Sequence, residues 1–311
     1  MSEDIPNAPK LPIGGGLKAV RYVLSLAGDL GPRRLAETVR SKNTCKACAF
    51  GTGGQRGGLH NEHNPGIEIC NKNIQAQSGD MRAAIPSAIF TDNTLAELRQ
   101  LNGRELEALG RLAQPLYKAP GADRYAVITY DDAIEIIAAR LRKTDPQRSF
   151  FYSSGRSSNE AAFILQLFAR LFGSNHVNNC SYYCHQASGV GLQASIGTGT
   201  ATVQYKDLEL ADTIFVIGAN PASNHPRFLK VLIECRRRGG NVIVINPARE
   251  PGLLRFASPS NFRSMIVGGA AVASHYVQPH IGGDLALLQG LAKAVLEANG
   301  QDTDYIDAHV N

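Results

Sequence analysis

The stretch that decides the fold runs from T-I-F-V-I-G (213–218) to N-V-I-V-I-N (241–246). Each of these two segments is a continuous apolar run, which is typical of a parallel strand buried on both faces. Residues 225–238, between them, have the spacing of a helix, and Gly239 and Gly240 follow as its end. Strand, helix and strand in this order predict a βαβ unit with a right-handed crossover. We therefore expect an α/β fold with a parallel sheet.

The α/β pattern begins earlier in the chain. S-F-F-Y-S-S (149–154) predicts a short strand, and residues 161–172 predict the helix after it. Ligands of parallel sheets bind beyond the carboxyl ends of the strands, so the loops that follow the strands are candidate site elements. These loops are residues 154–159, 218–225 and 246–249. Each is rich in residues that suit phosphate, ribose and base contacts, although any one of them also fits an ordinary loop.

A cysteine and a histidine stand side by side in N-N-C-S-Y-Y-C-H-Q-A-S-G (178–189). The small residues that follow His185 predict the start of a helix, whose dipole would favour a thiolate at Cys184. The pair alone fits a buried structural cysteine better. The rest of the chain shifts the interpretation of Cys184 toward a metal ligand, whereas Cys180 is predicted to be structural.

Three further cysteines have the spacing Cys45-x2-Cys48-x21-Cys70. Thiolates two residues apart can converge on one metal centre, and zinc or a [4Fe–4S] cluster would need four ligands. His60, His63 or a residue elsewhere would supply the fourth. A zinc ribbon would require a second C-x2-C, which the sequence lacks, and a loop that binds no metal remains an alternative.

Composition limits the class of protein. A chain of 311 residues has room for about two domains. Its 32 basic and 27 acidic residues give a net charge of +5, which suits anionic ligands without requiring nucleic acid. Since no apolar run reaches the ~18 residues of a membrane span and no signal peptide is recognisable, we expect a cytoplasmic protein.

The remainder of the first half predicts an arm and several helices. Gly14 to Gly16 open an arm that we expect to pack on a larger body. The triple glycine lacks the strand–turn–helix context of a phosphate loop, so it does not indicate nucleotide binding. Residues 79–94 predict a polar linker. Asp131 is the predicted N-cap of the last helix before residue 149, and a loop around Pro115 precedes that helix. The predicted helical segments are residues 20–26, 33–39, 95–109 and 131–142.

Seven blocks of the sequence carry a family resemblance. They are G-R-S-S-N-E-A-A-F (155–163), Q-L-F-A-R-L-F-G-S-N (166–175), C-S-Y-Y-C-H (180–185), S-I-G-T-G (195–199), G-A-N-P-A-S-N-H-P-R (218–227), I-N-P-A-R-E-P-G-L (245–253) and G-G-D-L-A-L-L (282–288). In order and spacing they resemble the molybdopterin-dependent oxidoreductases, in particular the formate-dehydrogenase-like alpha subunits of the FdhF/YdeP branch. The likeness runs from about Leu11 to the last residue.

The resemblance implies a role for each matching residue. Cys184 falls on the molybdenum ligand, and His185 falls on the histidine that handles the proton during formate oxidation. Cys45, Cys48 and Cys70 fall on iron–sulfur ligands. Lys72 falls on the lysine between the cluster and the nearer pterin. The residues implied to bind one guanine dinucleotide of a bis-molybdopterin guanine dinucleotide cofactor are Asn159, Gly218, Asn220, Ser223, Asn224, Asn246, Arg249 and Asp284.

The sequence departs from the family in two ways. The usual fourth cysteine is missing from A-F-G-T-G-G (49–54), although the branch that the chain resembles shares the three-cysteine pattern. Family members are also more than twice as long. We therefore expect a truncated chain that lacks the second pterin-binding domain and the active-site arginine, and that cannot complete the reaction alone. Cys184 should then lie at an open face beside the carboxyl ends of the strands at 213–218 and 241–246.

The resemblance also implies four segments. They are an arm (1–40), an iron–sulfur region (41–80), a connecting helical region (81–148) and a Rossmann-like domain that binds the molybdopterin guanine dinucleotide (149–311).

The implied activity is two-electron oxidation of formate, or of a similar small substrate, at a cysteine-ligated bis-pterin molybdenum. Electrons would pass to a [4Fe–4S] cluster and on to an electron-transfer partner protein. The alternatives are an inactive cofactor-binding fragment and a family member with another substrate. An NAD-dependent dehydrogenase is disfavoured, because no strand is followed by G-x-G-x-x-G with an acidic residue about 20 positions later.

Overall fold

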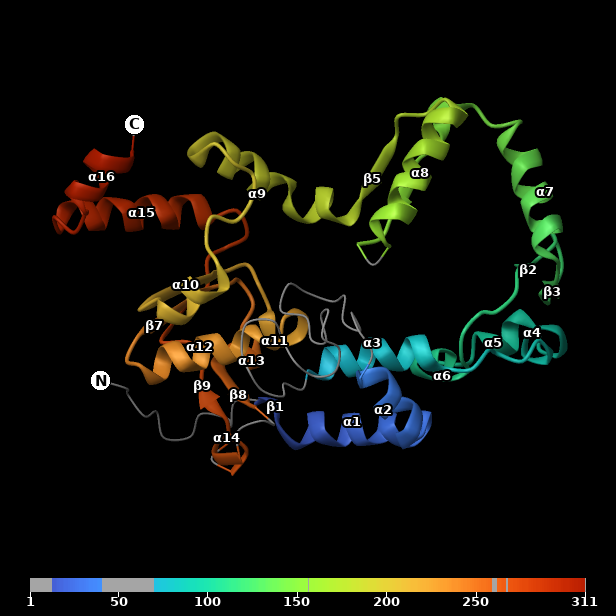
Figure 1. The fold of residues 1–311 in the computed structure, drawn as a ribbon, viewed down its shortest axis with the longest axis horizontal. Coiled ribbons are helices and arrows are strands. Elements are labelled where there is room, and N and C mark those ends of the chain that lie inside the picture. The colour runs from blue at the N-terminus through green and yellow to red at the C-terminus, as the bar shows by residue number, and fades with distance from the viewer. Residues whose placement is uncertain (1–12, 41–69, 156, 259–261, 267, 311) are drawn as a thin grey trace. The chain divides into compact units, whose positions relative to one another are not determined.

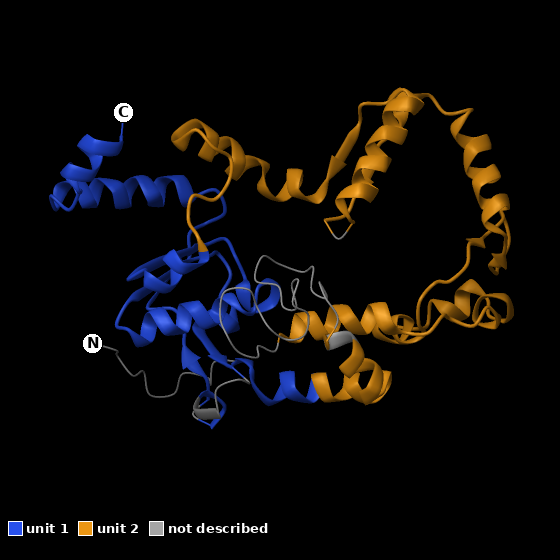
Figure 2. Cartoon of the chain, viewed as in Figure 1, with its two compact units in different colours: residues 1–22, 205–311 blue, residues 23–204 orange. Residues whose placement is uncertain are grey.

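The computed structural model describes residues 13–40, 70–155, 157–258, 262–266 and 268–310. Figure 1 labels the helices and strands along the chain. The chain forms two compact units, residues 1–22 with 205–311 and residues 23–204, which Figure 2 distinguishes by colour. This division differs from the four segments that the sequence suggests, and those segments remain a prediction.

The first unit is built on a parallel sheet with the strand order β10-β7-β6. β6 (Thr213–Ile217) pairs with β7 (Asn241–Ile245), and β10 (His275–Val277) pairs with the other edge of β7. α12 (Phe228–Arg237) connects β6 to β7 and packs on both. Leu229 and Leu232 of this helix are fully buried. The strand–helix–strand unit expected from the sequence is confirmed.

Only one face of β6 is covered in the part of the chain that the structure describes. Ile214 and Val216 are buried, whereas Phe215 and Ile217 are 43% and 45% exposed. The expectation that both faces of this strand are buried is therefore wrong for the structure as described. Successive side chains of a strand point to opposite faces, so a helix packed on one side covers every second residue.

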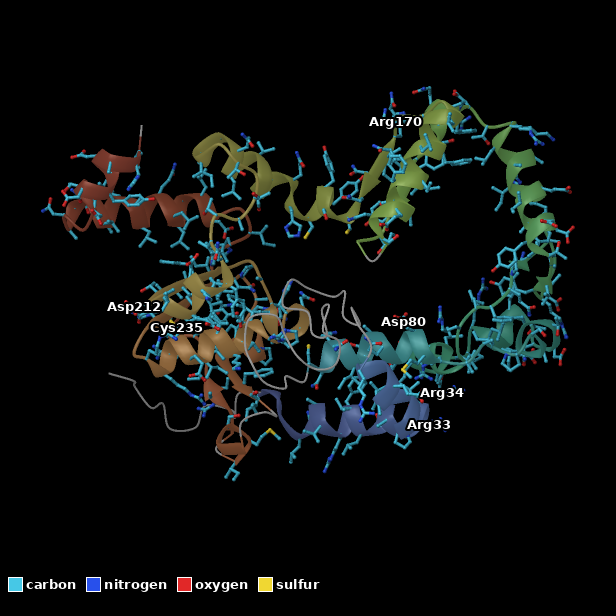
Figure 3. All side chains as sticks on the ribbon, viewed as in Figure 1. Arg33, Arg34, Asp80, Arg170, Asp212 and Cys235 are labelled. Carbon is cyan, nitrogen blue, oxygen red and sulfur yellow. The ribbon has the colours of Figure 1, made fainter. Side chains whose placement is uncertain are left out.

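Cys235 fixes the connection between α12 and β7 (Figure 3). Its side chain is fully buried, and its thiol donates a hydrogen bond to the carbonyl oxygen of Ala211 at 3.4 Å. A Cβ atom at Gly240 would lie 2.7 Å from the Cys235 sulfur and 2.6 Å from the carbonyl oxygen of Asp212. The close turn into β7 therefore requires glycine at position 240.

The glycine-rich arm packs on the first unit, as the sequence predicts. β1 (Gly14–Gly15) pairs in parallel with β8 (Arg255–Ala257), which also pairs with β9 (Ala270–Ala271). Gly15 has a φ of +73°, and a Cβ there would lie 2.5 Å from the carbonyl oxygen of Ala257. The triple glycine thus serves close backbone packing.

The remaining elements of the first unit are mostly short helices. They are α10 (Tyr205–Leu210), α11 (Pro221–Asn224), α13 (Pro251–Leu254), α14 (Phe262–Ile266), α15 (Asp284–Glu297) and α16 (Thr303–His309). α1 (Gly16–Leu30) leads from this unit into the second. Among the described residues, no helix has both the length and the apolar character that a membrane crossing requires.

The second unit contains helices, a short hairpin and a pair of parallel strands. Its elements are α2 (Pro32–Arg40), α3 (Asn71–Met81), α4 (Ala88–Asp92), α5 (Leu95–Leu98), α6 (Gly103–Ala108), β2 (Leu116–Tyr117), β3 (Ala126–Val127), α7 (Tyr130–Leu141), η1 (Pro146–Arg148), β4 (Phe151–Ser153), α8 (Asn159–Phe172), β5 (Val177–Asn179) and α9 (Cys180–Ile196). β2 and β3 form an antiparallel pair within the region predicted as a loop.

The structure differs from the sequence predictions in three places, and local capping explains the first two. The helix expected over residues 95–109 is divided, because the Asn102 side chain accepts hydrogen bonds from the backbone of Arg104 and Glu105 and begins α6. The N-cap of α7 is Thr129 and not Asp131, since Thr129 and Asp132 form a reciprocal capping box. The linker expected over residues 79–94 contains the end of α3 and the whole of α4.

Replacing Gly15 should show how far the arm depends on close packing. Gly15→Ala should lower the free energy of unfolding by more than the roughly 1–2 kcal/mol that an alanine costs in the left-handed region, because its methyl group also meets the Ala257 carbonyl. Gly31→Ala is the matched control. Gly31 has a φ of +82°, and no atom lies within 4 Å of the place that an added methyl group would take. Equal losses in urea titrations of the two variants would contradict this account.

Candidate functional site

β4 and β5 place the starts of two helices at one edge. The strands pair in parallel from Phe151↔Val177 to Ser153↔Asn179, so both end at the same level. α8 begins after Ser158, whose side chain accepts a hydrogen bond from the backbone of Ala161 at 3.2 Å. α9 begins directly after Asn179. Backbone N–H groups of both helices are therefore available near the carboxyl ends of the strands.

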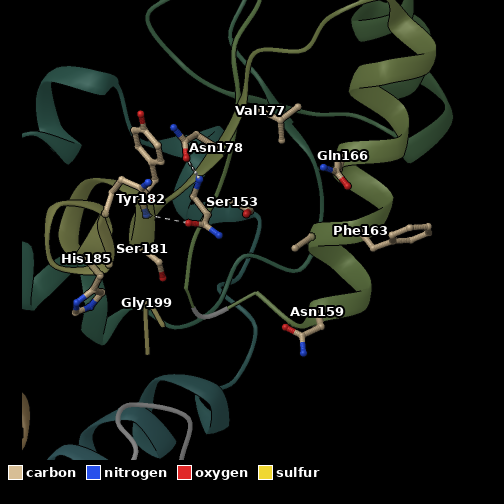
Figure 4. Close-up of a pocket in the computed structure, with 14 residues that line it drawn as sticks. Ser153, Asn159, Phe163, Gln166, Val177, Asn178, Ser181, Tyr182, His185 and Gly199 are labelled. Carbon is tan, nitrogen blue, oxygen red and sulfur yellow. Dashed lines mark hydrogen bonds between the residues drawn. The ribbon is translucent and has the colours of Figure 1, made fainter. Parts of the chain in front are cut away.

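A pocket of about 680 Å³ lies at this edge. Figure 4 shows residues of α8 on one side and residues of α9 on the other. The pocket is lined by Ser153, Asn159, Ala162, Phe163, Gln166, Val177, Asn178, Asn179, Ser181, Tyr182, His185, Gln186, Gly189 and Gly199. Its lining includes hydroxyl, amide and imidazole groups. It therefore suits a small polar ligand.

The two predicted catalytic residues are placed differently. His185 lines the pocket, whereas Cys184 is exposed and is not one of the lining residues. Neighbouring residues of a helix project about 100° apart, which explains the separation. The open position expected for Cys184 is confirmed by its exposure. Its place beside β6 and β7, which belong to the other unit, remains a prediction.

The start of α9 corrects one sequence argument. The small residues after His185 predict a helix that begins there, but α9 begins at Cys180 because the Asn179 side chain accepts a hydrogen bond from the backbone of Tyr182 at 3.2 Å. Cys184 therefore lies in the second turn. The influence of a helix dipole falls off within the first turn. The dipole thus acts on Cys180 more strongly than on Cys184.

The loop before α8 lies close to Cys180. A Cβ at Gly155 would be 2.6 Å from the sulfur of Cys180. The cysteine is half-buried. This contact gives Cys180 a packing role between β4 and α9, in line with the structural role predicted for it.

A second group of predicted site residues lies at the carboxyl edge of β6 and β7. Asn246 is buried, with its side-chain amide donating to the carbonyl oxygen of Ala219 at 3.4 Å. Its side-chain oxygen accepts a hydrogen bond from the backbone of Ala248 at 2.9 Å. Asn220 caps α11 by accepting from the backbone of Ser223 at 3.3 Å. Both asparagines thus organise the loops in which they lie.

Other predicted residues at this edge remain accessible. Gly218 has a φ of +61° and open space where a side chain would stand. Ser223, Asn224 and Arg249 are exposed, and Asp284 is half-buried at the start of α15. Asn159 lines the pocket in the other unit. All the predicted dinucleotide residues except Asn159 therefore belong to the first unit.

The sequence analysis missed two residues at this edge. Tyr276 of β10 contacts the loop after β7 through its hydroxyl group, and Gln278 donates to the carbonyl oxygen of Pro247 at 2.9 Å. The only local signal was a tyrosine and a glutamine at the end of a short apolar segment, H-Y-V-Q (275–278). Their contacts arise from strand pairing, which that segment alone does not reveal.

The comparisons decide the family. Residues 111–306 match the model of the molybdopterin oxidoreductase family, described as "Molybdopterin oxidoreductase". The chain belongs to this family. The match covers α9 with Cys184 and His185, and also the loops after β6 and β7. Membership implies molybdenum with a pterin cofactor.

Three relatives illustrate the likeness. The chain is 35% identical over 320 residues to the oxidoreductase Rv2900c of Mycobacterium tuberculosis, covering 97% of this chain and 40% of that protein. It is 41% identical over 239 residues to the protein YdeP of Escherichia coli, a match that covers 76% of this chain and 32% of that protein. It is 30% identical over 197 residues to the F420-dependent formate dehydrogenase 1 subunit alpha of Methanococcus maripaludis, a match that covers 63% of this chain and 26% of that protein. The chain thus spans well under half the length of these relatives.

The residues at the edge of β6 and β7 leave room and polar groups for a ligand. Gly218 leaves open space for the approach of a ligand. Ser223 and Asn224 offer exposed hydrogen-bonding groups, and Arg249 offers a positive charge. This donor set suits ribose hydroxyls and phosphate oxygens. The chain therefore has suitable chemistry at the edge where parallel sheets bind ligands.

The iron–sulfur ligands predicted from the sequence lie only partly within the described residues. Cys45, Cys48, His60 and His63 lie outside the described residues. Cys70 is buried directly before α3. Lys72, in the first turn of α3, donates to the side-chain oxygen of Gln75 at 3.1 Å. Within the described ranges, no group of three or more His, Cys, Asp or Glu residues is placed to hold a metal ion.

The contact between Gly155 and Cys180 can be tested by paired substitutions. Gly155→Ala should lower the free energy of unfolding by about 1–3 kcal/mol, because the added methyl group overlaps the sulfur. Cys180→Ala in the same chain should restore most of that loss by removing the sulfur. Urea titration would measure both effects.

Gly191→Ala on α9 is the control, since no atom lies within 4 Å of its added methyl group. This variant should be as stable as the parent or slightly more stable, because alanine favours helix. A Gly155→Ala chain as stable as the parent would show that the close contact is absent.

Proposed function

We propose that this chain is the part of a formate-dehydrogenase-type molybdenum enzyme that supplies the metal-binding thiolate and the site for one guanine dinucleotide of a bis-molybdopterin guanine dinucleotide cofactor. The observation that carries the proposal is the exposed Cys184 beside His185, which lines a polar pocket. Family membership over residues 111–306 supports it. The activity belongs to the whole enzyme, because this chain spans 40% of the length of Rv2900c.

Cys184 and His185 have separate proposed roles. The Cys184 thiolate would bind the molybdenum. A ring nitrogen of His185 would take the proton that the substrate releases. When bound, the cofactor supplies a metal centre that accepts two electrons. Oxidation of formate to carbon dioxide would release one proton and two electrons, and His185 would hold that proton.

Formate is the proposed substrate for two reasons. The alpha subunit of the F420-dependent formate dehydrogenase is a relative of this chain. The pocket also offers side-chain donors from Asn159, Asn178 and Ser181, which suit a small carboxylate. A similar small substrate that carries both a transferable hydrogen and an oxygen acceptor would satisfy the same groups.

The proposal includes an electron path. Cys45, Cys48 and Cys70 would hold a [4Fe–4S] cluster, with His60 or His63 as candidates for the fourth ligand. Lys72 would lie between the cluster and the nearer pterin. Its ammonium group, which now bonds Gln75, would offer a positive contact to an anionic cofactor. An electron-transfer protein would accept the electrons, and the proposed location of the enzyme is the cytoplasm.

Replacing Cys184 tests the thiolate assignment. Cys184→Ala should abolish formate-dependent dye reduction in the cofactor-loaded enzyme and leave the circular dichroism spectrum unchanged, since the side chain is exposed. Cys180→Ser is the matched control from the same helix and should keep activity. Undiminished turnover in the Cys184→Ala enzyme would rule out the assignment.

Metal analysis tests the cluster. Anaerobically purified protein should contain iron and sulfide near the four-to-four ratio of a single cubane, and Cys45→Ser or Cys70→Ser should reduce both. His60→Ala and His63→Ala, compared side by side, would show which imidazole is a ligand. Protein that contains zinc alone, or no metal, would refute the cluster.

A further inference from the structure

The loop after β7 is attached to β10 by hydrogen bonds along its whole length. The backbone N–H of Asn246 donates to the carbonyl oxygen of Val277 at 3.0 Å. The side-chain amide of Gln278 donates to the carbonyl oxygen of Pro247 at 2.9 Å. The Tyr276 hydroxyl group makes the next two hydrogen bonds, with the backbone of Ala248 and of Glu250. β10 therefore determines the shape of this loop.

The hydroxyl group of Tyr276 holds the backbone on both sides of Arg249. It donates to the carbonyl oxygen of Ala248 at 2.6 Å and accepts from the backbone N–H of Glu250 at 3.0 Å. One oxygen atom thus fixes the residue before Arg249 and the residue after it. Such a pair of bonds restricts the backbone from which the Arg249 side chain projects.

The aromatic ring of Tyr276 acts on the same arginine. The Arg249 guanidinium carbon lies 6.0 Å from the centre of the Tyr276 ring. A guanidinium group at this distance is attracted to the negative face of the ring. Tyr276 therefore contacts both the backbone around Arg249 and its charged group.

Arg249 keeps its charge available. The side chain is exposed, and among the described residues no carboxylate lies within ion-pair distance of it. Arg237, at the far end of α12, differs because it pairs with Glu234. A guanidinium group that is restrained but unpaired is well suited to bind two oxygens of a phosphate group at once.

The surroundings of Arg249 favour a phosphate ligand. The loop begins at the carboxyl end of β7, where parallel sheets bind ligands. The side chain of Asn246 links it to Ala219, directly after Gly218, whose φ of +61° leaves open space. The loops after β6 and β7 are thus fixed to one another, and the second of them carries the accessible Arg249.

We infer that Tyr276 is a positioning residue that holds Arg249 for the diphosphate of the guanine dinucleotide. This inference rests on the proposed function, because the proposed cofactor supplies the diphosphate. Restraining the arginine before binding reduces the conformational entropy lost when the ligand binds. Tyr276 itself need not touch the ligand.

Binding of two probes separates this role from a general effect on stability. The full chain would be produced in cells that do not make molybdopterin and titrated calorimetrically with GDP and with guanosine. Tyr276→Phe keeps the ring but removes two hydrogen bonds, and it should weaken GDP binding roughly tenfold. Guanosine binding should stay unchanged, because guanosine has no phosphate. Tyr305→Phe on α16 removes the same atom elsewhere and should change neither affinity.

A double-mutant cycle tests whether Tyr276 acts through Arg249. Arg249→Ala should weaken GDP binding at least as much as Tyr276→Phe does. Adding Tyr276→Phe to Arg249→Ala should then have no further effect, because the arginine that Tyr276 positions has been removed. The positioning role would be overturned if the two substitutions reduced GDP affinity by factors that multiply in the double variant. An equal loss of guanosine affinity in Tyr276→Phe would also overturn it.

The outcomes also distinguish the positioning role of Tyr276 from the existence of the dinucleotide site. Parent protein that binds GDP, together with a Tyr276→Phe variant that binds it equally well, would overturn the role of Tyr276 alone. Parent protein that does not bind GDP at millimolar concentration would overturn the dinucleotide site at this edge, and the positioning role with it.

Discussion

The parallel pairing of β6 with β7 is the constraint on which the proposed dinucleotide site depends. Five residue pairs, from Thr213↔Asn241 to Ile217↔Ile245, bring the two strands to an end at the same level. Each fully buried side chain of α12, such as Leu229 and Leu232, contributes about 1.5–3 kcal/mol to holding this arrangement. The loops that begin at Gly218 and Asn246 are therefore neighbours because of apolar burial some distance from any ligand.

The polar residues at this edge divide into two groups. Asn220 and Asn246 use their side chains to satisfy backbone groups of the loops, as buried or capping amides must. Ser223, Asn224 and Arg249 remain exposed. The first group gives the loops a defined shape, and the second leaves polar atoms for a ligand. A substitution in the first group is therefore expected to alter binding indirectly, through loop geometry.

The sequence predicts the elements whose signals are local and strong. Continuous apolar runs mark β6 and β7, and α8 and α12 are predicted as the helices that follow strands. The start of α9 is misplaced because its boundary depends on the cap at Asn179. The hairpin of β2 and β3 is missed because two-residue strands are too short to show a period.

Prediction of the candidate site from the sequence is likewise limited to residues with local signals. Arg249 is predicted correctly in the loop after β7, but Tyr276 is missed because its bonds join positions 28 and 26 apart in the chain. Such contacts exist only once β10 has paired with β7.

The two cysteines of α9 show that electrostatic support and access do not coincide in this helix. Cys180 is in the first turn, where the field of the helix dipole is strongest, but its sulfur is packed against Gly155. Cys184 is exposed but lies one turn further along, where the dipole contributes little. A metal ion can deprotonate a coordinating thiol without help from a helix. The assignment of Cys184 as the ligand therefore depends on its exposure beside His185, and its thiolate would be stabilised chiefly by the metal that it binds.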